Sequence, residues 1–207
     1  MKMLVKTLAA AAATLAFAVN AHAAIGSASA ADVTLAGEPA DAFAYEQGWN
    51  PQSGPNGDTS GFESDFASYG VGDWQLLDKY EAGGSFGNAG QLAFTFSGDA
   101  GSDGSWTVTN TTGTALTLDL VFAVHAGNQG GAWLFDDQTI GAGQTLEGDW
   151  EILWTVGQNG NNNPDFSNLT LFARDVSPIP EPGTYAMLLG GLAVTGFALR
   201  RKRKNAR

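Results

Sequence analysis

The 207-residue sequence contains no cysteine. Disulfide bonds and thiolate metal sites are therefore excluded, and the folded part of the chain must be held together by its hydrophobic core. Histidine is also scarce, because only His22 and His125 occur. A bound metal ion would thus have to take mainly oxygen ligands, as calcium does.

Basic residues are almost absent from the middle of the chain. Between residues 24 and 182 only two residues are basic, Lys79 and Arg174, whereas all 21 acidic residues fall in this span, which gives it a formal charge of −19. A body of this charge is repelled by nucleic acid and by anionic lipid surfaces. We therefore predict no nucleic-acid partner and expect divalent cations to be the counterions.

The body also lacks amphipathic helix patterns and internal repeats. Instead, short stretches alternate apolar and polar residues, most clearly over residues 116–124, where every second residue from Leu116 to Val124 is apolar. Alternate residues of a strand point to the same face of a sheet, so this period predicts half-buried β-strands. Four further stretches show the same alternation: residues 92–97, 106–109, 151–156 and 169–171.

Clusters of glycine, asparagine and aspartate separate these stretches, at residues 98–104, 110–115, 127–131 and 157–165. These residue types favour turns. The sequence therefore predicts an all-β domain over residues 24–177, an antiparallel β-sandwich that is jelly-roll-like. Residues 48–68 follow no regular pattern, and we expect an acidic surface loop there that is held by Trp49 and Phe62.

The N-terminal 23 residues have the three parts of a secretory signal peptide. Lys2 and Lys6 form a basic start, an apolar run follows from Leu8 to Val19, and Ala21-His22-Ala23 ends the segment. The small residues Ala21 and Ala23 predict a signal peptidase site directly after Ala23. Processing there would remove His22 and leave His125 as the histidine of the exported chain.

The C-terminal residues 178–207 differ from the acidic body. Pro178, Pro180 and Pro182 resist regular structure, so we expect the sandwich to end before them and an accessible linker to follow. The apolar run 185–199 spans about 22 Å as a helix, against about 30 Å for a hydrocarbon core, and predicts a marginal transmembrane helix. A basic end at 200–207 follows, which predicts a cytoplasmic position for Arg200, Arg201, Lys202, Arg203 and Lys204.

The order of Pro180-Glu181-Pro182, an apolar stretch and a basic cluster closely resembles the PEP-CTERM sorting signal. That signal occurs in Gram-negative bacteria that make exopolysaccharide and is recognised by the membrane enzyme exosortase. The resemblance implies that this chain is an exosortase substrate, anchored transiently in the inner membrane and then released to the cell surface or extracellular matrix. A retained membrane anchor is the alternative interpretation of the same tail.

No residue pattern in the body indicates catalysis. His125 stands alone, with Asp119 as a conceivable partner, and pairs of acids such as Asp136 and Asp137 are expected from composition. The turn at 98–104 offers Asp99 and Asp103 as weak calcium ligands, although it does not match a known calcium loop. We therefore predict no catalytic residues, no required cofactor and a protein that is not an enzyme.

We predict a structural or interaction role in exopolysaccharide or biofilm, and two other functions stay open. The sequence contains six tryptophans. Trp106 and Trp154 are in phase with apolar neighbours and are predicted to be core. One or two of Trp49, Trp74, Trp133 and Trp150 are expected to be exposed, where they could stack on sugars. A carbohydrate-binding module is thus the alternative, and a surface glycoside hydrolase using acid pairs such as Glu147 with Asp149 and Glu151 is the third.

Overall fold

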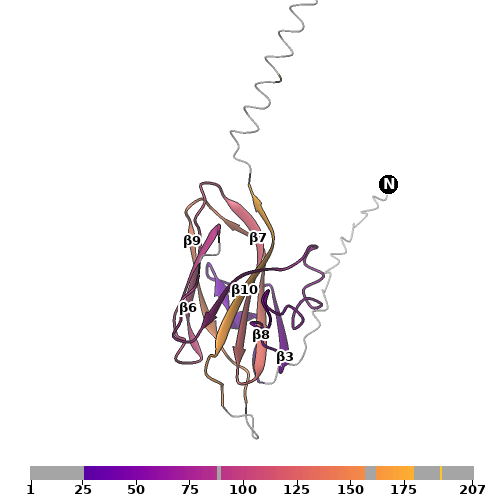
Figure 1. Cartoon of the computed structure of the whole chain (residues 1–207), viewed down its shortest axis with the longest axis vertical. Helices are drawn as coiled ribbons and strands as arrows, with labels where there is room; N and C mark the ends of the chain where they lie inside the picture. The colour runs from indigo at the N-terminus through magenta and orange to yellow at the C-terminus, as the bar shows by residue number, and fades with distance from the viewer. Residues whose placement is uncertain (1–25, 88–89, 157–161, 180–191, 193–207) are drawn as a thin grey trace, which may run out of the picture.

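The protein is an antiparallel β-sandwich, as the sequence predicts (Figure 1). The computed structural model describes residues 26–87, 90–156 and 162–179, together with Leu192. One sheet has the order β3-β8-β7-β10-β4 and the other has the order β5-β6-β9, while β1 and β2 form a small separate pair. The elements are η1 (Ala30–Asp32), β1 (Thr34–Leu35), β2 (Glu38–Pro39), β3 (Ala42–Gln47), β4 (Gln75–Glu81), β5 (Leu92–Phe96), β6 (Asp103–Asn110), β7 (Leu116–Ala126), β8 (Gln129–Ile140), β9 (Thr145–Glu151) and β10 (Asn168–Pro178).

The two ends of the chain lie largely beyond this description. The predicted signal peptide and, apart from Leu192, the predicted transmembrane segment 185–199 fall outside the described residues. In the part of the chain that is described, no helix is long and apolar enough to cross a membrane.

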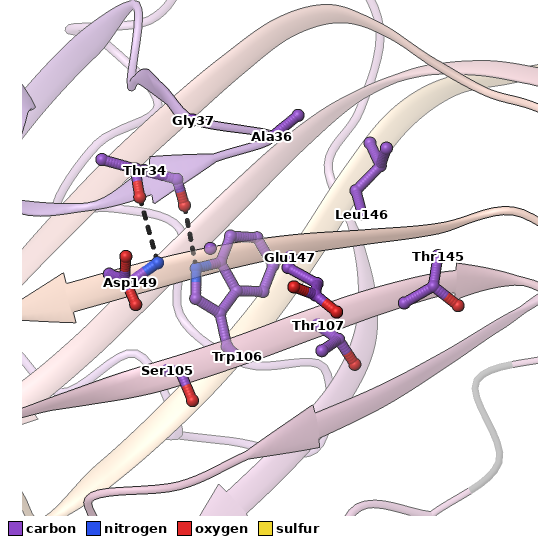
Figure 2. A pocket seen from close by; sticks show the side chains of 11 residues that line it. Thr34, Ala36, Gly37, Ser105, Trp106, Thr107, Thr145, Leu146, Glu147 and Asp149 are labelled. Carbon is purple, nitrogen blue, oxygen red and sulfur yellow. Dashed lines mark hydrogen bonds between the residues drawn. The ribbon is translucent and has the colours of Figure 1, made fainter.

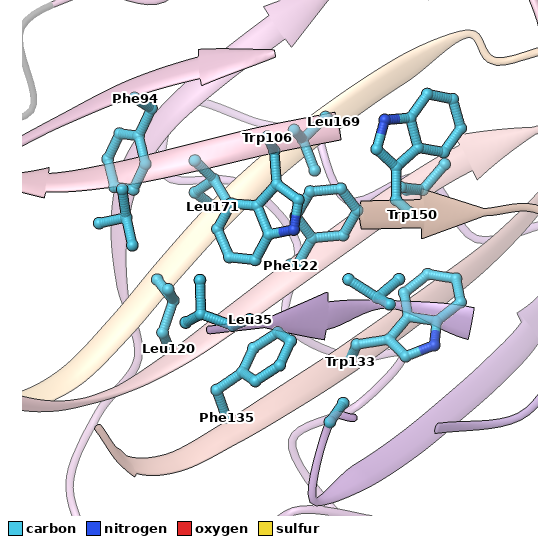
Figure 3. Close-up of a cluster of buried hydrophobic side chains, with 14 of the residues drawn as sticks. Leu35, Phe94, Trp106, Leu120, Phe122, Trp133, Phe135, Trp150, Leu169 and Leu171 are labelled. Atoms are coloured by element: carbon cyan, nitrogen blue, oxygen red, sulfur yellow. The ribbon is translucent and has the colours of Figure 1, made fainter. Parts of the chain in front are cut away.

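The main core lies between the two sheets (Figure 3). Strand β7 contributes the predicted face, on which Leu120 and Phe122 are fully buried, and β6 and β9 contribute Trp106 and Trp150. The rings of Trp106 and Phe122 pack with their centroids 4.8 Å apart. Because burial of apolar surface is the dominant favourable term in folding, this aromatic layer compensates for the absence of disulfide bonds.

Four of the five predicted stretches coincide with strands, namely β5, β6, β7 and β10. The fifth, 151–156, is wrong, because the paired strand β9 ends at Glu151 and Trp154 then makes only an isolated bridge with Gly26. Alternate residues stay buried beyond Glu151, as Ile152 and Trp154 show. Strand β6 pairs with β9 only as far as Asp103, which lies opposite Glu151. The apolar alternation therefore continues beyond the point where β9 still has a partner strand.

Strands β3, β4, β8 and β9 and the short pair β1 and β2 were not expected from the sequence. Strand β8 begins at Gln129, inside the predicted turn 127–131, so the turn consists only of Gly127 and Asn128. Both residues have positive φ, 61° in each case, as a two-residue hairpin of type I′ requires. The first seven residues of β8 are all buried, which removes the period-two alternation by which a strand is recognised.

A second core explains this continuous burial. The predicted loop around residues 48–68 is present and lies against the outer face of the five-stranded sheet, where Trp49 and Phe62 are buried as expected. Their ring centroids are 5.9 Å apart. A Cβ on Gly130 would lie 2.2 Å from the Trp49 ring, so the indole occupies space that only a glycine of β8 leaves. We call residues 49–74 the cover.

Strand β10 runs further than the sequence predicts. Its last residue is Pro178, which pairs with Leu116 of β7, whereas the sandwich was expected to end before this proline. Proline is tolerated at a strand end because no further ladder bond needs its missing N–H. The next residue, Ile179, still donates its N–H to the carbonyl of Ala115 at 2.8 Å.

Candidate functional site

A polar groove follows the outer face of the three-stranded sheet (Figure 2). The alternation of side chains along β6 and β9 produces this groove. Trp106 of β6 and Trp150 of β9 point into the core, whereas the residues next to them on each strand point outward. In cross-strand register, Ser105 lies opposite Asp149 and Thr107 lies opposite Glu147. The outer face therefore carries hydroxyls on β6 and carboxylates on β9.

The segment around β1 forms one rim of the groove. Thr34 accepts a hydrogen bond from the indole N–H of Trp106 through its carbonyl at 3.1 Å, and another from the Asp149 N–H through its Oγ1 at 3.0 Å (Figure 2). Ala36 donates its N–H to the Glu147 carbonyl at 2.7 Å. A Cβ on Gly148 would lie 2.0 Å from the Thr34 carbonyl oxygen, so this glycine permits the close approach of the rim.

The groove is large enough for part of a polymer chain. It holds about 670 Å³, and a second hollow of about 430 Å³ adjoins it, sharing Thr34 and Asp149. Small-molecule sites commonly range from about 300 to 1,000 Å³. We call the two hollows together the β9 groove. Its charged lining residues are all acidic: Asp32, Asp103, Glu147, Asp149 and Glu151.

Hydroxyl groups next to the groove are held in fixed orientations. The Oγ1 atoms of Thr95 and Thr107 are 2.7 Å apart across β5 and β6, and those of Thr109 and Thr145 are 2.8 Å apart across β6 and β9. Each hydroxyl that donates to its neighbour keeps acceptor capacity toward solvent. The face thus offers ordered acceptors and carboxylates, which suits a ligand rich in hydroxyl groups.

Both basic side chains of the acidic body are engaged away from the groove. Lys79 donates to the carbonyls of Gln52 and Gly54 at 2.8 and 2.6 Å, while the Arg174 Nε lies 2.6 Å from Asp119 Oδ2. Among the described residues no cation therefore lines the groove, and the charged groups that an anionic ligand would meet there are carboxylates. An uncharged ligand avoids this repulsion.

The Asp119–Arg174 pair is a buried ion pair that sequence analysis did not identify. Both side chains are about nineteen-twentieths buried, Arg174 lies 4.3 Å from the centroid of the Trp74 ring, and its Nη1 donates to the carbonyl of Gly70 at 3.3 Å. Trp74 and Gly70 belong to the cover, so the pair fastens the cover to β7 and β10. The sequence offered one indication of this pair, namely that Asp119 lies within residues 116–124, the stretch with the clearest apolar alternation.

Asp136 lies beside this pair and has a perturbed carboxyl group. Burial, and then the negative charges of Asp119, Asp137 and Asp41, raise the pKa of Asp136 to about 6. Its backbone N–H donates to Asp41 Oδ2 at 2.8 Å, which keeps a second carboxylate close. Asp136 does not line the β9 groove, so its shifted titration concerns stability rather than ligand binding at that site.

The weak calcium candidates, Asp99 and Asp103, are used differently. Asp99 Oδ2 accepts hydrogen bonds from the Tyr80 hydroxyl at 2.8 Å and the Gly83 N–H at 2.6 Å, and these contacts lower the pKa of Asp99. Asp103 lies instead at the end of the β9 groove. Among the described residues no group of three or more acidic or histidine side chains is arranged to hold a metal ion, and calcium binding stays a prediction.

His125 is separated from the partner that the sequence suggested. It lies near the end of β7, six residues from Asp119, a distance of about 20 Å along a strand. The side chain is half-buried, burial lowers the pKa of its imidazole, and its Nδ1 has no hydrogen-bond partner within the described part of the chain. Asp119, the conceivable partner that the sequence offered, is therefore too far from His125 to act with it.

The expectation of an exposed tryptophan is also wrong. Trp49, Trp133 and Trp150 are buried together with the predicted core residues Trp106 and Trp154, and Trp74 is half-buried under Arg174. The core takes these rings because each buries a large apolar surface. None of the six indoles is thus fully exposed for stacking on sugars, and Trp74 alone keeps part of its surface accessible.

Comparison with known families identifies the tail. Residues 178–203 match the PEP-CTERM protein-sorting motif. No match is found among curated proteins or among solved structures. The motif marks an exported protein that is sorted through exosortase, as its resemblance suggested, and the match covers the tail without reaching the sandwich before Pro178.

The residues predicted to act in processing lie outside the described structure. These are the sorting motif Pro180, Glu181 and Pro182, the signal peptidase site at Ala21 and Ala23, and the basic cluster from Arg200 to Lys204. The family match includes the first of these groups and the basic residues up to Arg203. The roles assigned to the individual residues stay predictions.

Proposed function

We propose that this protein acts outside the cell as a non-enzymatic interaction protein that binds uncharged, hydroxyl-rich polysaccharide through the β9 groove. Its tail would deliver it to the membrane for sorting, and its sandwich would then reach the cell surface or matrix. The observation that carries the proposal is the chemistry of the groove. Ordered hydroxyls and carboxylates line it, and no basic side chain does.

Carboxylates and hydroxyls are suitable partners for sugar hydroxyl groups. A carboxylate accepts hydrogen bonds from two neighbouring hydroxyls, and such charge-assisted bonds contribute about 1.5–3 kcal/mol each. Glu147 and Asp149 alternate along β9 and face the same side, so successive hydroxyls of an extended chain could meet successive carboxylates. This arrangement replaces the tryptophan stacking that the buried indoles exclude.

Calorimetry with the full chain tests the proposal. Titration with dextran, an uncharged polymer, and with the exopolysaccharide of the producing strain should give heat of binding, whereas alginate, which is polyanionic, should give none in the presence of a chelator. Glu147→Gln should weaken binding about tenfold, because it removes one charge-assisted hydrogen bond.

A matched substitution provides the control. Glu46→Gln makes the same chemical change on an exposed residue of β3, in the other sheet, and should leave the affinity unchanged. Absence of binding to both uncharged polymers, or an equal loss of affinity in Glu46→Gln and Glu147→Gln, would refute the groove as the binding site. Alginate binding that disappears with chelator would instead support calcium-mediated contact.

A further inference from the structure

We propose that the end of the sandwich from which the tail leaves is a surface that rests on anionic lipid headgroups before processing. This proposal rests on the proposed delivery of the chain to a membrane by its tail. The surface consists of residues 90–91, the turns 111–115 and 141–144, and Ile179. We call it the tail-side end.

The register of the strands places these segments together. Leu116, which follows the first turn, pairs with Pro178 and with Ile140, which precedes the second turn. In Figure 1, β10 runs the length of its sheet and ends at this end of the body. The last described residue before the motif, Ile179, is still hydrogen-bonded to Ala115. The hydrogen-bonded fold therefore extends to the residue directly before the motif.

Charged residues are missing from the tail-side end. Its turns read Thr-Thr-Gly-Thr-Ala and Gly-Ala-Gly-Gln, and Gly90 and Gln91 are also uncharged. On the strands that border it, the first acidic residues are Asp119, Asp137, Glu147 and Asp175, three or four residues or about 10 Å away, and Asp119 is buried and paired with Arg174. In a body with a formal charge of −19, this end is the part that an anionic surface repels least.

The absence of charge at the tail-side end matters because few residues separate this end from the predicted membrane segment. Five residues, 180–184, lie between Ile179 and Tyr185, where the apolar run begins, and the six steps along the chain span at most about 20 Å. A charge near an anionic leaflet changes the energy by about 1 kcal/mol, and the effect is screened beyond about 8–10 Å. Acidic residues at the tail-side end would therefore oppose docking, whereas those at the far end are too distant to do so.

The tail-side end is also tied into one unit. The buried Asn110 side chain donates to the carbonyls of Thr114 at 2.8 Å and Ile140 at 3.0 Å, and its backbone N–H donates to the Gln144 carbonyl at 2.9 Å. Thr111 donates its N–H to the carbonyl of Gln91 at 2.9 Å. These bonds join all three segments, so the end presents a fixed surface to the membrane.

The absence of cysteine permits a direct test by site-specific labelling. The full chain is incorporated into vesicles of phosphatidylcholine and phosphatidylglycerol that carry a headgroup-linked nitroxide quencher. A fluorophore on Gly113→Cys or Ala142→Cys, both exposed turn positions, should be quenched several-fold more than one on Ala100→Cys. Ala100 lies in the β5–β6 turn at the far end, and strand β7 implies a separation of about 35 Å.

A charge change tests the electrostatic part of the proposal. In the Gly113→Cys background, Ala142→Asp should reduce quenching on the anionic vesicles, and high salt or vesicles of phosphatidylcholine alone should restore it. Ala100→Asp, the same change at the far end, should have no effect. Equal quenching at positions 100, 113 and 142, or no response to Ala142→Asp, would overturn the proposal. The assay contains no sorting enzyme, so its failure is distinct from a failure of sorting in cells.

Discussion

At the residue scale, the carboxylates around Asp136 make the stability of the protein depend on pH. The burial of Asp136 and the charges of Asp119, Asp137 and Asp41 raise its pKa to about 6, from an ordinary value of 3.8. The folded state therefore holds a proton that the unfolded chain has already released in this window. Since stability falls with pH wherever the folded state binds more protons, it should decline as pH rises from about 4 to 6.

Asp136→Asn should remove that decline. An amide cannot be deprotonated, so the variant should be more stable than the parent protein above pH ~6, by about 1 kcal/mol after solvent screening, and similar to it near pH ~4. Urea unfolding across this range measures the difference. Asp165→Asn, at an exposed residue, should follow the parent curve. A constant offset between Asp136→Asn and the parent at all pH values would contradict the assignment.

The same cluster explains where the two cations of the body are used. Arg174 neutralises Asp119 in the interior, while Lys79 binds carbonyls of the cover. Breaking a buried ion pair leaves a desolvated charge, which is costly. These residues therefore secure the structure, and they leave the β9 groove without positive charge.

At the element scale, the cover is a structural part of the sandwich despite its loop-like sequence. Phe62 is fully buried and packs with its ring centroid 5.3 Å from that of Phe172 and 5.5 Å from that of Trp74. It thereby joins the cover to the outer face of the five-stranded sheet. Without it, Val121 and Ala123 of β7 would lose part of the layer that excludes water from them.

Phe62→Ala should lower the free energy of unfolding by about 3–5 kcal/mol, because it removes apolar contacts and leaves a cavity. It should also expose residues 49–74 to limited proteolysis. Denaturant unfolding and mass spectrometry of the fragments measure both effects. Val71→Ala, at a side chain that is 84% exposed, should change stability by less than about 0.5 kcal/mol. Stability within that limit for Phe62→Ala would show that the cover is dispensable.

At the scale of the whole molecule, charge separates the functions along the chain. The acidic body and the basic terminus are separate parts of the sequence, and the uncharged tail-side end includes Ile179, directly before the motif Pro180-Glu181-Pro182. A basic end favours the cytoplasmic side of a membrane, which is the orientation predicted for this tail. In the proposed docking, the uncharged end is the part of the body that faces lipid.

Sorting predicts a mature protein shorter than the gene product at both ends. Immunoblots with tags near each terminus should show loss of both in a strain with active exosortase. Replacement of Pro180, Glu181 and Pro182 by alanine should preserve the C-terminal tag, whereas Pro55→Ala, at an exposed proline of the cover, should not. An intact C-terminus in the parent protein would indicate a retained anchor instead.

The sequence alone determined the fold class and the sorting motif, because both are encoded by residues that are close together in the sequence. Period-two alternation predicts the inward face of β7 directly, and the motif at 178–203 is recognised by residues that are consecutive. The same locality explains the error at 151–156. Apolar alternation reports which residues are buried, whereas a β-strand also needs a neighbouring strand to pair with. The pairing of β9 with β6 stops at Glu151, which lies opposite Asp103, the first residue of β6.

The tertiary structure alone decided that Trp49, Trp133 and Trp150 are also buried, where the cations lie and what the surface offers. Residues distant in sequence, such as Thr34 and Asp149, meet at the β9 groove through pairing that no local pattern records. The buried pair of Asp119 and Arg174 and the uncharged tail-side end depend likewise on strand register. Contacts of this kind form between segments far apart in the chain, so their chemistry becomes visible only when the sheets are assembled.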